Sequence, residues 1–245
     1  MGRGTQAGAA GTRGRTVRAL DWRQIEDELN QYGCAVVPGL LNPAQCAALA
    51  AQYDDASRFR SRVVMQRHGF GQGEYQYWAH PLPDVVAGLR EQLYGPLAAI
   101  ANRWHASMGL ETRFPSSHAD FLARCHAAGQ TRPTPLLLRY REGDYNCLHQ
   151  DLYGEHVFPL QLAVLLSRPQ DDFTGGEFVL TEQRPRMQSR LEVVPLMQGD
   201  AVIFPVAQRP VNGKRGSYRV NMRHGVSRLR SGMRHTLGII FHDAS

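Results

Sequence analysis

The chain has 245 residues, of which 42% are hydrophobic and 20% are charged. This length is enough for one substantial hydrophobic core, and hydrophobic segments recur as far as residue 241, so a largely disordered chain is excluded. No run of about 18 uninterrupted hydrophobic residues occurs, which excludes a transmembrane helix and a membrane partner.

The net charge of +6 is concentrated at the N-terminus. Residues 1–20 contain Arg3, Arg13, Arg15 and Arg18 and no acidic residue, so the remainder carries only about +2. That balance does not by itself indicate a nucleic-acid-binding protein. We expect residues 1–20 to form a flexible basic tail, because they lack the hydrophobic segment of a secretory signal.

The four cysteines show no spacing typical of a disulfide framework or a zinc site. They are Cys34, Cys46, Cys125 and Cys147. Without an export signal, we expect reduced thiols in a cytoplasmic protein. Cys147 lies two residues before a histidine of interest, so it is either a metal ligand or, as we favour, a packed thiol.

The hydrophobic spacing before residue 133 is helical. Four helices are expected: Asp21–Tyr32 ending at Gly33, a second from Asn42-Pro43 to about Asp54, a third segment from Pro83 to about Met108, and Ser117–Ala128. Because Gly95-Pro96 interrupts the third segment, we expect either two helices or one kinked helix.

After Pro133 the pattern changes to short strands separated by turn residues. The predicted strands are Leu136–Tyr140, Gln161–Leu166, Glu177–Thr181, Glu192–Pro195, Ala201–Phe204, Tyr218–Met222 and Thr236–Phe241. This number and spacing indicate a jelly roll. We therefore predict an α+β fold: a single domain over residues 21–245, with a helical part at about 21–132 packed outside a jelly-roll core at about 133–243.

The strongest functional signal is His149-Gln150-Asp151, which follows a predicted strand and the Gly143-Asp144 turn. Residues two apart on an extended segment point to the same face, so His149 and Asp151 can converge on one metal ion. Two histidines and one carboxylate form the facial arrangement of non-haem Fe(II) oxygenases. His224 is our choice for the third ligand. Arg234 follows it by ten residues, and it would supply the fixed cation that the distal carboxylate of a metal-bound 2-oxo acid needs.

Three other histidines compete with His224. His156 is too near His149 in sequence to lie comfortably on an opposing strand. His235 directly follows Arg234, so the two would face opposite sides of a strand. His242 leaves no arginine ten residues further on.

With these residues in place, the segment 133–243 resembles the Fe(II)/2-oxoglutarate-dependent dioxygenase superfamily. RYREGDYNCLHQD, GGEF, GDAVIF and the HGV…SGMR run are similar, in order, to its proximal His-x-Asp, its glycine turn, the strand before its distal histidine, and that histidine with its arginine. The resemblance implies a double-stranded β-helix in which His149, Asp151 and His224 bind Fe(II). Arg234 would bind the C5 carboxylate of 2-oxoglutarate, and Tyr140 would assist it.

The same resemblance implies oxidation of a substrate with O2 and 2-oxoglutarate, release of succinate and CO2, and ascorbate as an optional reductant. The ten-residue spacing between His224 and Arg234 is similar to that of prolyl 4-hydroxylases. The whole chain resembles a bacterial oxygenase family described as acting on damaged nucleic acid, although it lacks the R-x-N-x-T-x-R run of the DNA-alkylation-repair dioxygenases.

Two arginine-rich stretches bear on the substrate. Residues 201–242 contain eight cationic and no acidic side chains, and residues 58–78 mix arginines with aromatic residues. Cations and aromatic rings suit a nucleic-acid groove. A cationic run is, however, also typical of a solvated face, and aromatic residues are also typical of a hydrophobic core.

Three hypotheses therefore stand. The first is an oxygenase of alkylated nucleic acid that removes an N-methyl group by oxidation. The second is a hydroxylase of a protein side chain or small molecule. The third is a non-catalytic metal-binding jelly roll that docks nucleic acid, which an intact Arg234 disfavours.

Overall fold

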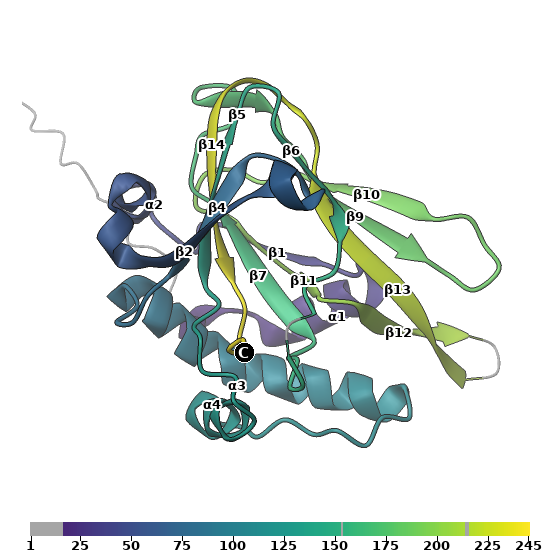
Figure 1. The fold of residues 1–245 in the computed structure, drawn as a ribbon. Helices are drawn as coiled ribbons and strands as arrows, with labels where there is room; N and C mark the ends of the chain where they lie inside the picture. Colours follow the sequence, from purple (N-terminus) through teal and green to yellow (C-terminus); the bar gives the residue numbers. More distant parts are fainter. Residues whose placement is uncertain (1–16, 153, 214–215) are drawn as a thin grey trace, which may run out of the picture.

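The computed structural model describes residues 17–152, 154–213 and 216–245. Two antiparallel sheets face each other, and helices cover the outer face of the larger one (Figure 1). This is the predicted α+β arrangement with a jelly-roll core. In the described part of the chain, no helix is both long enough and hydrophobic enough to cross a membrane.

The larger sheet has eight strands among the described residues. Its order is β1 (Ala35–Val37), β11 (Ala201–Pro205), β7 (Leu160–Leu165), β14 (Leu229–Ile239), β5 (Leu136–Arg141), β4 (Glu74–Trp78) and β2 (Phe59–Val64), with β8 (Phe173–Gly175) paired to β14. Every pairing in the sheet is antiparallel.

The smaller sheet has six strands among the same residues. Its order is β10 (Arg190–Val194), β9 (Phe178–Gln183), β13 (Gly216–Val226), β6 (Tyr145–His149) and β3 (Gly71–Gln72), with β12 (Gln208–Gly213) paired to β13. The strands β13 and β14 are much longer than the sequence predicts, and β6, β8 and β12 were not predicted.

The first half of the chain is not purely helical, which corrects the sequence interpretation. It supplies β1 to β4, and β4 and β2 extend the larger sheet beyond β5 (Figure 1). The segment 58–78 is therefore an antiparallel strand pair with a short helical turn, η4 (Met65–His68), between its strands. The short turns η2 (Ala51–Asp54) and η3 (Ala56–Arg58) precede it.

The four predicted helices are present, and their ends lie at the capping residues that the sequence indicates. Asp21 caps α1 (Trp22–Tyr32), which ends at the left-handed Gly33, and Asn42 and Gln45 form a capping box on α2 (Pro43–Ala50). Ser117 caps α4 (His118–Ala127).

The third segment is one continuous helix, α3 (Asp84–Ser107), with Pro96 inside it, so the two-helix alternative is wrong. Proline removes one backbone hydrogen bond. The helix nevertheless persists because it buries a long face that includes Leu89, Leu93, Leu97 and Trp104.

Alternation along β7 divides the interior into two hydrophobic clusters. Leu160, Leu162 and Val164 pack with the helices, whereas Ala163 and Leu165 point between the two sheets. Gln161 shares the second face, so its side chain is directed to the interior of the jelly roll.

The expectation of a flexible tail over residues 1–20 is wrong at its end. Val17 and Leu20 are buried in the helix-side cluster, and Val17–Ala19 forms the short turn η1. Residues 1–16, with three of the four tail arginines, lie outside the described residues.

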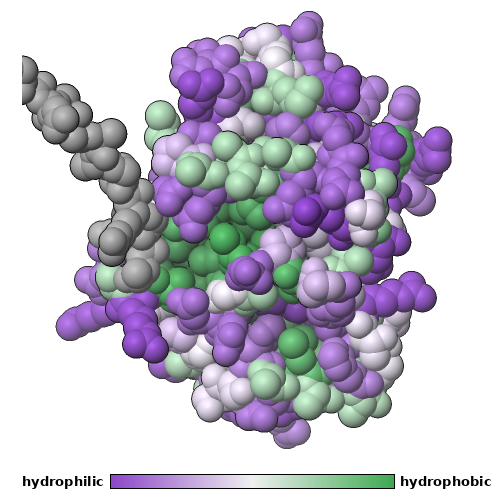
Figure 2. Space-filling model, turned by 90° about the vertical axis from the view of Figure 1, so that its left-hand side faces the viewer, coloured by the Kyte–Doolittle hydropathy of each residue, from purple (hydrophilic) through white to green (hydrophobic). Residues whose placement is uncertain are grey.

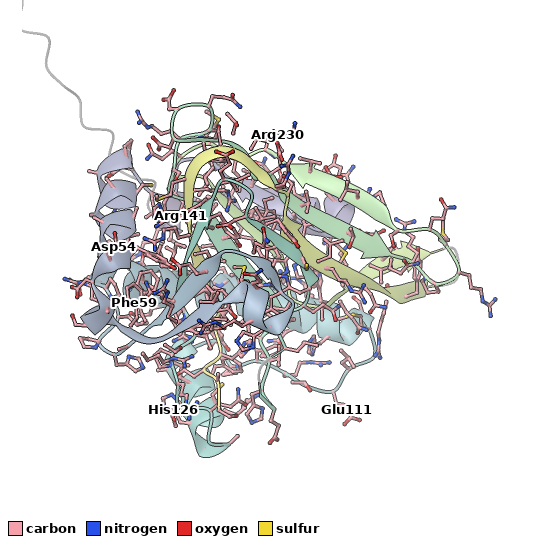
Figure 3. All side chains as sticks on the ribbon, turned by 45° about the horizontal axis from the view of Figure 1, so that its top comes forward. Asp54, Phe59, Glu111, His126, Arg141 and Arg230 are labelled. Atoms are coloured by element: carbon pink, nitrogen blue, oxygen red, sulfur yellow. The ribbon has the colours of Figure 1, made fainter. Side chains whose placement is uncertain are left out.

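The outer surface is mixed in character. Figure 2 shows hydrophobic side chains gathered in a hollow on the face to the left of Figure 1, surrounded by hydrophilic ones. Figure 3 shows Arg141 and Arg230 on the side of the molecule away from His126 and Glu111, which lie beside the helical layer.

Candidate metal centre

Two neighbouring strands of the smaller sheet bring His149 and His224 together. The strands β6 and β13 are antiparallel, with His149 and His224 directly opposite each other in the register. Along β13, Val220, Met222, His224 and Val226 are buried, while Arg219, Asn221 and Arg223 point outward. The two imidazole rings consequently lie 4.1 Å apart between their centroids.

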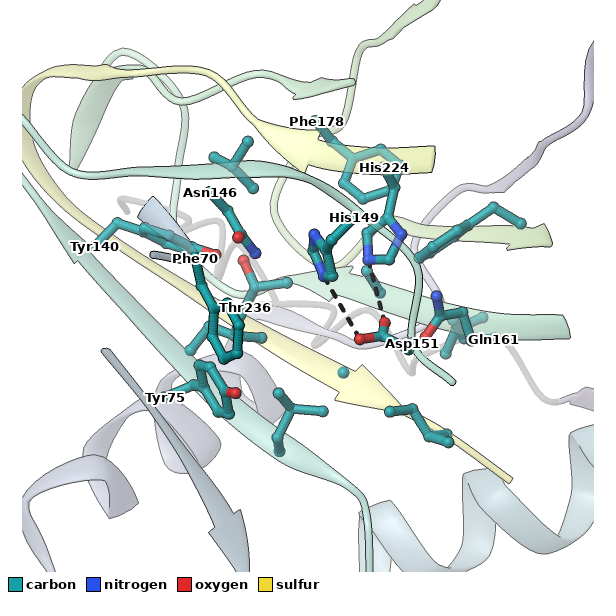
Figure 4. Close-up of a pocket in the computed structure, with 18 of the residues that line it drawn as sticks. Phe70, Tyr75, Tyr140, Asn146, His149, Asp151, Gln161, Phe178, His224 and Thr236 are labelled. Atoms are coloured by element: carbon teal, nitrogen blue, oxygen red, sulfur yellow. Dashed lines mark ion pairs between the residues drawn. The ribbon is translucent and has the colours of Figure 1, made fainter. Parts of the chain in front are cut away.

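Asp151 joins the histidines from a loop rather than from a strand. β6 ends at His149, and the intervening Gln150 donates side-chain hydrogen bonds to the carbonyls of Ala207 (3.1 Å) and Met222 (2.9 Å). These bonds fix the loop against β13. Asp151 then lies 3.5 Å from Nε2 of His149 and 3.2 Å from Nε2 of His224 (Figure 4).

These three side chains can hold a metal ion. Their ligand atoms all lie within 4.8 Å of one another, and Asp151 and His224 are buried. The Nδ1 atom of His149 lies 2.8 Å from the carbonyl of Cys147; an Nδ1–H donated there leaves Nε2 free as a ligand. Two histidines and one carboxylate are a donor set suited to Fe(II).

Burial and mutual contact determine the charges of this cluster. Burial alone would raise the pKa of Asp151, but hydrogen bonding with both histidines and their charges hold it well below its usual range. Burial lowers the pKa of His224, and Asp151 only partly offsets this. Burial also opposes protonation of His149, but Asp151 outweighs it and raises the pKa of that histidine.

Arg234 lies deeper in the same cavity and forms no ion pair among the described residues. Its side chain is fully buried, and it donates from Nη1 to the hydroxyl of Thr236. Burial lowers its pKa to about 10, so it stays charged at neutral pH. The buried Arg234 Nε and Tyr140 hydroxyl have no hydrogen-bond partner among the described residues.

A cationic pocket with unused donors fits a small dicarboxylate. An anion there would satisfy the Arg234 Nε donor and the Tyr140 hydroxyl together. Burial also raises the pKa of Tyr140, so its hydroxyl keeps its proton and can donate. The cavity thus contains three residues that can hold a metal ion and, apart from them, unused donors suited to a carboxylate.

The rest of the cavity is mostly apolar. Its wall is formed by aromatic and aliphatic side chains, with a few amides and one threonine (Figure 4). The apolar lining comprises Phe70, Tyr75, Tyr77, Leu136, Leu138, Leu162, Ala163, Phe178, Phe204, Val226 and Ile240. Such a lining limits the access of bulk water to the metal site.

Sequence reasoning did not single out Thr236 or Asn146, and it included Phe70 only among the aromatic residues of the stretch 58–78. Thr236 could have been found, because it is two residues from Arg234 and so shares its strand face. Asn146 enters the cavity on β6, where it lies opposite Val226 of β13, and Phe70 enters it through the pairing of β3 with β6, which joins residues about 75 positions apart.

The competing histidines are placed elsewhere. His235 packs its ring against Tyr53, on the other side of β14 from Arg234, as the strand alternation predicts. His242 is buried, and its Nδ1 accepts the backbone N–H of Phe158. Cys147 is exposed, so the expectation of a packed thiol is wrong there.

Only some of the eight cationic side chains in residues 201–242 are exposed. Arg209 is buried and pairs with the carboxylate of Glu182, and Arg234 is the buried residue of the cavity. Lys214 and Arg215 lie outside the described residues. The exposed members of the run are Arg219, Arg223, Arg228 and Arg230.

Comparison with known families gives one match over most of the chain. Residues 73–244 match a family described as "Oxygenase, catalysing oxidative methylation of damaged DNA". The chain is also 52% identical to an uncharacterised protein of Mycobacterium tuberculosis, seen in two strains, over 165 residues that make up 67% of this chain and 71% of that protein.

Solved structures share the fold at low sequence identity. A 2-oxoglutarate–Fe(II) oxygenase-family oxidoreductase from Burkholderia pseudomallei superposes with a TM-score of 0.56 at 15% identity, covering 93% of this chain and 94% of that one. A prolyl-4-hydroxylase from Pseudomonas putida gives 0.53 at 14% identity, covering 91% and 100%. A prolyl hydroxylase from Trichoplax adhaerens, bound to a peptide of hypoxia inducible factor, gives 0.55 at 12% identity, covering 89% and 87%.

Proposed function

This chain belongs to the family of oxygenases described as catalysing oxidative methylation of damaged DNA, and from that membership we propose that it is an Fe(II)- and 2-oxoglutarate-dependent dioxygenase of damaged, alkylated DNA. One observation carries the cofactor part of the proposal. The His149–Asp151–His224 cluster shares a cavity with a buried Arg234 that forms no ion pair among the described residues.

Each residue has a distinct role in this proposal. His149, Asp151 and His224 hold Fe(II), and the bound metal supplies the redox chemistry that activates O2. Arg234 binds the C5 carboxylate of 2-oxoglutarate with both charge and hydrogen bonds, and the Tyr140 hydroxyl donates to the same group. The apolar wall limits side reactions by excluding water.

In the overall reaction, 2-oxoglutarate and the substrate together supply the four electrons that reduce O2, so no other reductant is consumed. One oxygen atom of O2 enters succinate and the other enters a C–H bond of the substrate, while 2-oxoglutarate loses CO2. A methyl group on a base nitrogen becomes a hydroxymethyl group, which leaves as formaldehyde and restores the N–H. We place this reaction in the cytoplasm, on the basis of the reduced thiols.

The test is succinate release from 2-oxoglutarate by the full chain with Fe(II), O2 and ascorbate. Methylated oligonucleotides are compared with peptides as stimulants. His224→Ala should abolish turnover and weaken Mn²⁺ binding measured by calorimetry, whereas His156→Ala, a histidine outside the cluster, should change neither. Tyr140→Phe should weaken 2-oxoglutarate binding by about 10-fold, as expected for one hydrogen bond to a charged group.

The outcomes separate the hypotheses. Stimulation by peptides and not by methylated DNA would replace the DNA substrate with a protein side chain. Metal binding by wild type that is weakened in His224→Ala, without any binding of 2-oxoglutarate, would leave only a metal-binding module.

A further inference from the structure

An aromatic pair stands at the entrance to the cavity. Phe70 lines the cavity, yet 46% of its surface is exposed. The exposed His68 stacks on it, with ring centroids 5.3 Å apart and an interplanar angle of 23°. Figure 4 shows Phe70 on the same side of the cavity as Tyr140 and Thr236.

The backbone that carries Phe70 is fixed by hydrogen bonds, although the side chain is partly exposed. The Phe70 N–H donates to the carbonyl of the buried Met65 (3.1 Å), and the Phe70 carbonyl accepts from Cys147 (2.9 Å). The next residue, Gly71, pairs with Asn146 on β6, the strand that ends at His149. Phe70 is therefore held at a set place beside the metal cluster.

The same turn carries an unpaired positive charge. Arg67 is exposed and forms no ion pair with any described acidic residue. It lies in η4 with His68, one residue before the stacked pair begins. A flat aromatic surface and a nearby free guanidinium are the two elements that a nucleotide requires: a face for the base and a cation for the phosphate.

The molecule has a further cavity next to the metal cavity. A second cavity adjoins the first and shares Gln150 with it. It is lined by amides and apolar groups, among them Asn221, Gln208 and the half-exposed Leu152. This favours a polymeric substrate whose reacting unit enters the cavity while its neighbours remain outside.

We propose that the His68–Phe70 pair is a stacking platform for a nucleobase at the entrance, and that Arg67 contacts an adjacent phosphate. The inference rests on the proposed function, because it assumes a nucleic-acid substrate. It adds the residues that select a base rather than a peptide or a free small molecule. Phe70 thereby determines specificity.

The test measures binding of fluorescein-labelled single-stranded DNA to the full-length Mn²⁺-loaded protein by anisotropy. The probes are one oligonucleotide with a single methylated adenine and the same oligonucleotide with an abasic site there. Phe70→Ala should weaken binding of the methylated probe by about 5- to 150-fold, the effect of losing one stacked base. Phe70→Trp should restore binding.

The abasic probe makes the result specific to stacking. Wild type should bind the abasic probe as weakly as Phe70→Ala binds the methylated probe. The Phe70→Ala substitution should not lower the affinity for the abasic probe any further. Arg67→Ala should lower the affinity for both probes by the same factor, and it should reduce the slope of log affinity against log salt concentration by about 1. Leu191→Ala, an exposed apolar residue on β10 at the other end of the smaller sheet, should change neither.

The failures are distinguishable. An unchanged affinity of Phe70→Ala for the methylated probe, with wild type binding well, would overturn the platform and leave the DNA substrate intact. Absence of DNA binding by wild type, with peptide-stimulated succinate release, would overturn the platform and the DNA substrate together.

Discussion

Arg234 on β14 lies directly opposite Tyr140 on β5, and its guanidinium carbon is 5.7 Å from the centre of the Tyr140 ring. The pair is enclosed between the sheets, with both side chains buried and both retaining an unused hydrogen-bonding atom. A buried cation without an acid partner is unfavourable for folding. Its presence here implies a ligand that supplies the missing negative charge.

Removing Arg234 should therefore stabilise the ligand-free protein. Burial lowers the pKa of Arg234 from 12.5 to about 10, which corresponds to about 3 kcal/mol of disfavoured charge. We expect Arg234→Met to raise the free energy of unfolding by about 1–3 kcal/mol in urea titrations without 2-oxoglutarate, and to abolish the stabilisation that 2-oxoglutarate gives wild type.

Arg209 provides the matched control. It is equally buried, but it pairs with the buried Glu182. Arg209→Met should destabilise the fold by about 3–5 kcal/mol, because it leaves a buried carboxylate with less compensation. If both variants lost stability to the same extent, Arg234 would be an ordinary structural residue.

Gln161 offers a second case of an unused buried donor. It is 3% exposed, it lines the cavity, and its Nε2 has no hydrogen-bond partner among the described residues. An unsatisfied buried donor costs about 1–3 kcal/mol, so Gln161→Leu should keep or increase the melting temperature. The same variant should lower succinate turnover, because a donor kept at such a cost serves a ligand; full activity would contradict that role.

Much of this site was open to prediction from the sequence. His149, Asp151, His224, Arg234 and Tyr140 all line one cavity. Residue spacing and strand alternation pointed to the first four, and the family resemblance supported them and added Tyr140. The signals were local: alternation along β5, β13 and β14, and turn residues between them. Side chains two apart on a strand share a face wherever that strand is placed.

The missed parts depend on contacts between distant segments. β2 is only partly buried along its length, so it shows no hydrophobic alternation. β4 is a strand because it pairs with β5, about 60 residues away. The position of Asp151 likewise depends on Gln150 reaching carbonyls on β13 and before β12, which no local pattern records.

Two glycines flank Phe70, and we expect the stability of the fold to depend on Gly71 more than on Gly69. Gly71 has φ +126°, and a Cβ there would lie 2.4 Å from the carbonyl oxygen of Tyr145. Gly69 has φ +71° with open space around it. We expect Gly71→Ala to cost about 1–3 kcal/mol from the clash in addition to strain, and Gly69→Ala only about 1 kcal/mol.

Chemical denaturation of the two alanine variants checks this order. Gly71→Ala should also weaken DNA binding, since β3 would separate from β6 and Phe70 would move. Equal losses of stability in the two variants would show that β3 is not held against β6 as the structure has it.

Stability should fall in mild acid because of a buried histidine far from the metal cluster. His118 lies against the ring of Tyr94, and its Nε2 is 2.8 Å from the Phe241 carbonyl. Burial, with help from the nearby Arg90, lowers its pKa from 6.5 to about 4. Between these two values the unfolded chain binds a proton that the folded chain does not, so the free energy of unfolding decreases as the pH falls from about 6.5 to about 4.

The loss attributable to His118 is about 3 kcal/mol, which corresponds to lowering its pKa from 6.5 to about 4. His118→Gln keeps a donor toward the Phe241 carbonyl but cannot titrate, so urea titrations from pH 7 to 4 should show a shallower decline than in wild type. His68→Gln, which replaces an exposed histidine, should leave the decline unchanged. A wild-type slope retained in His118→Gln would mean that acid destabilisation arises at other groups, such as the buried His242, whose pKa is also lowered to about 4 by burial.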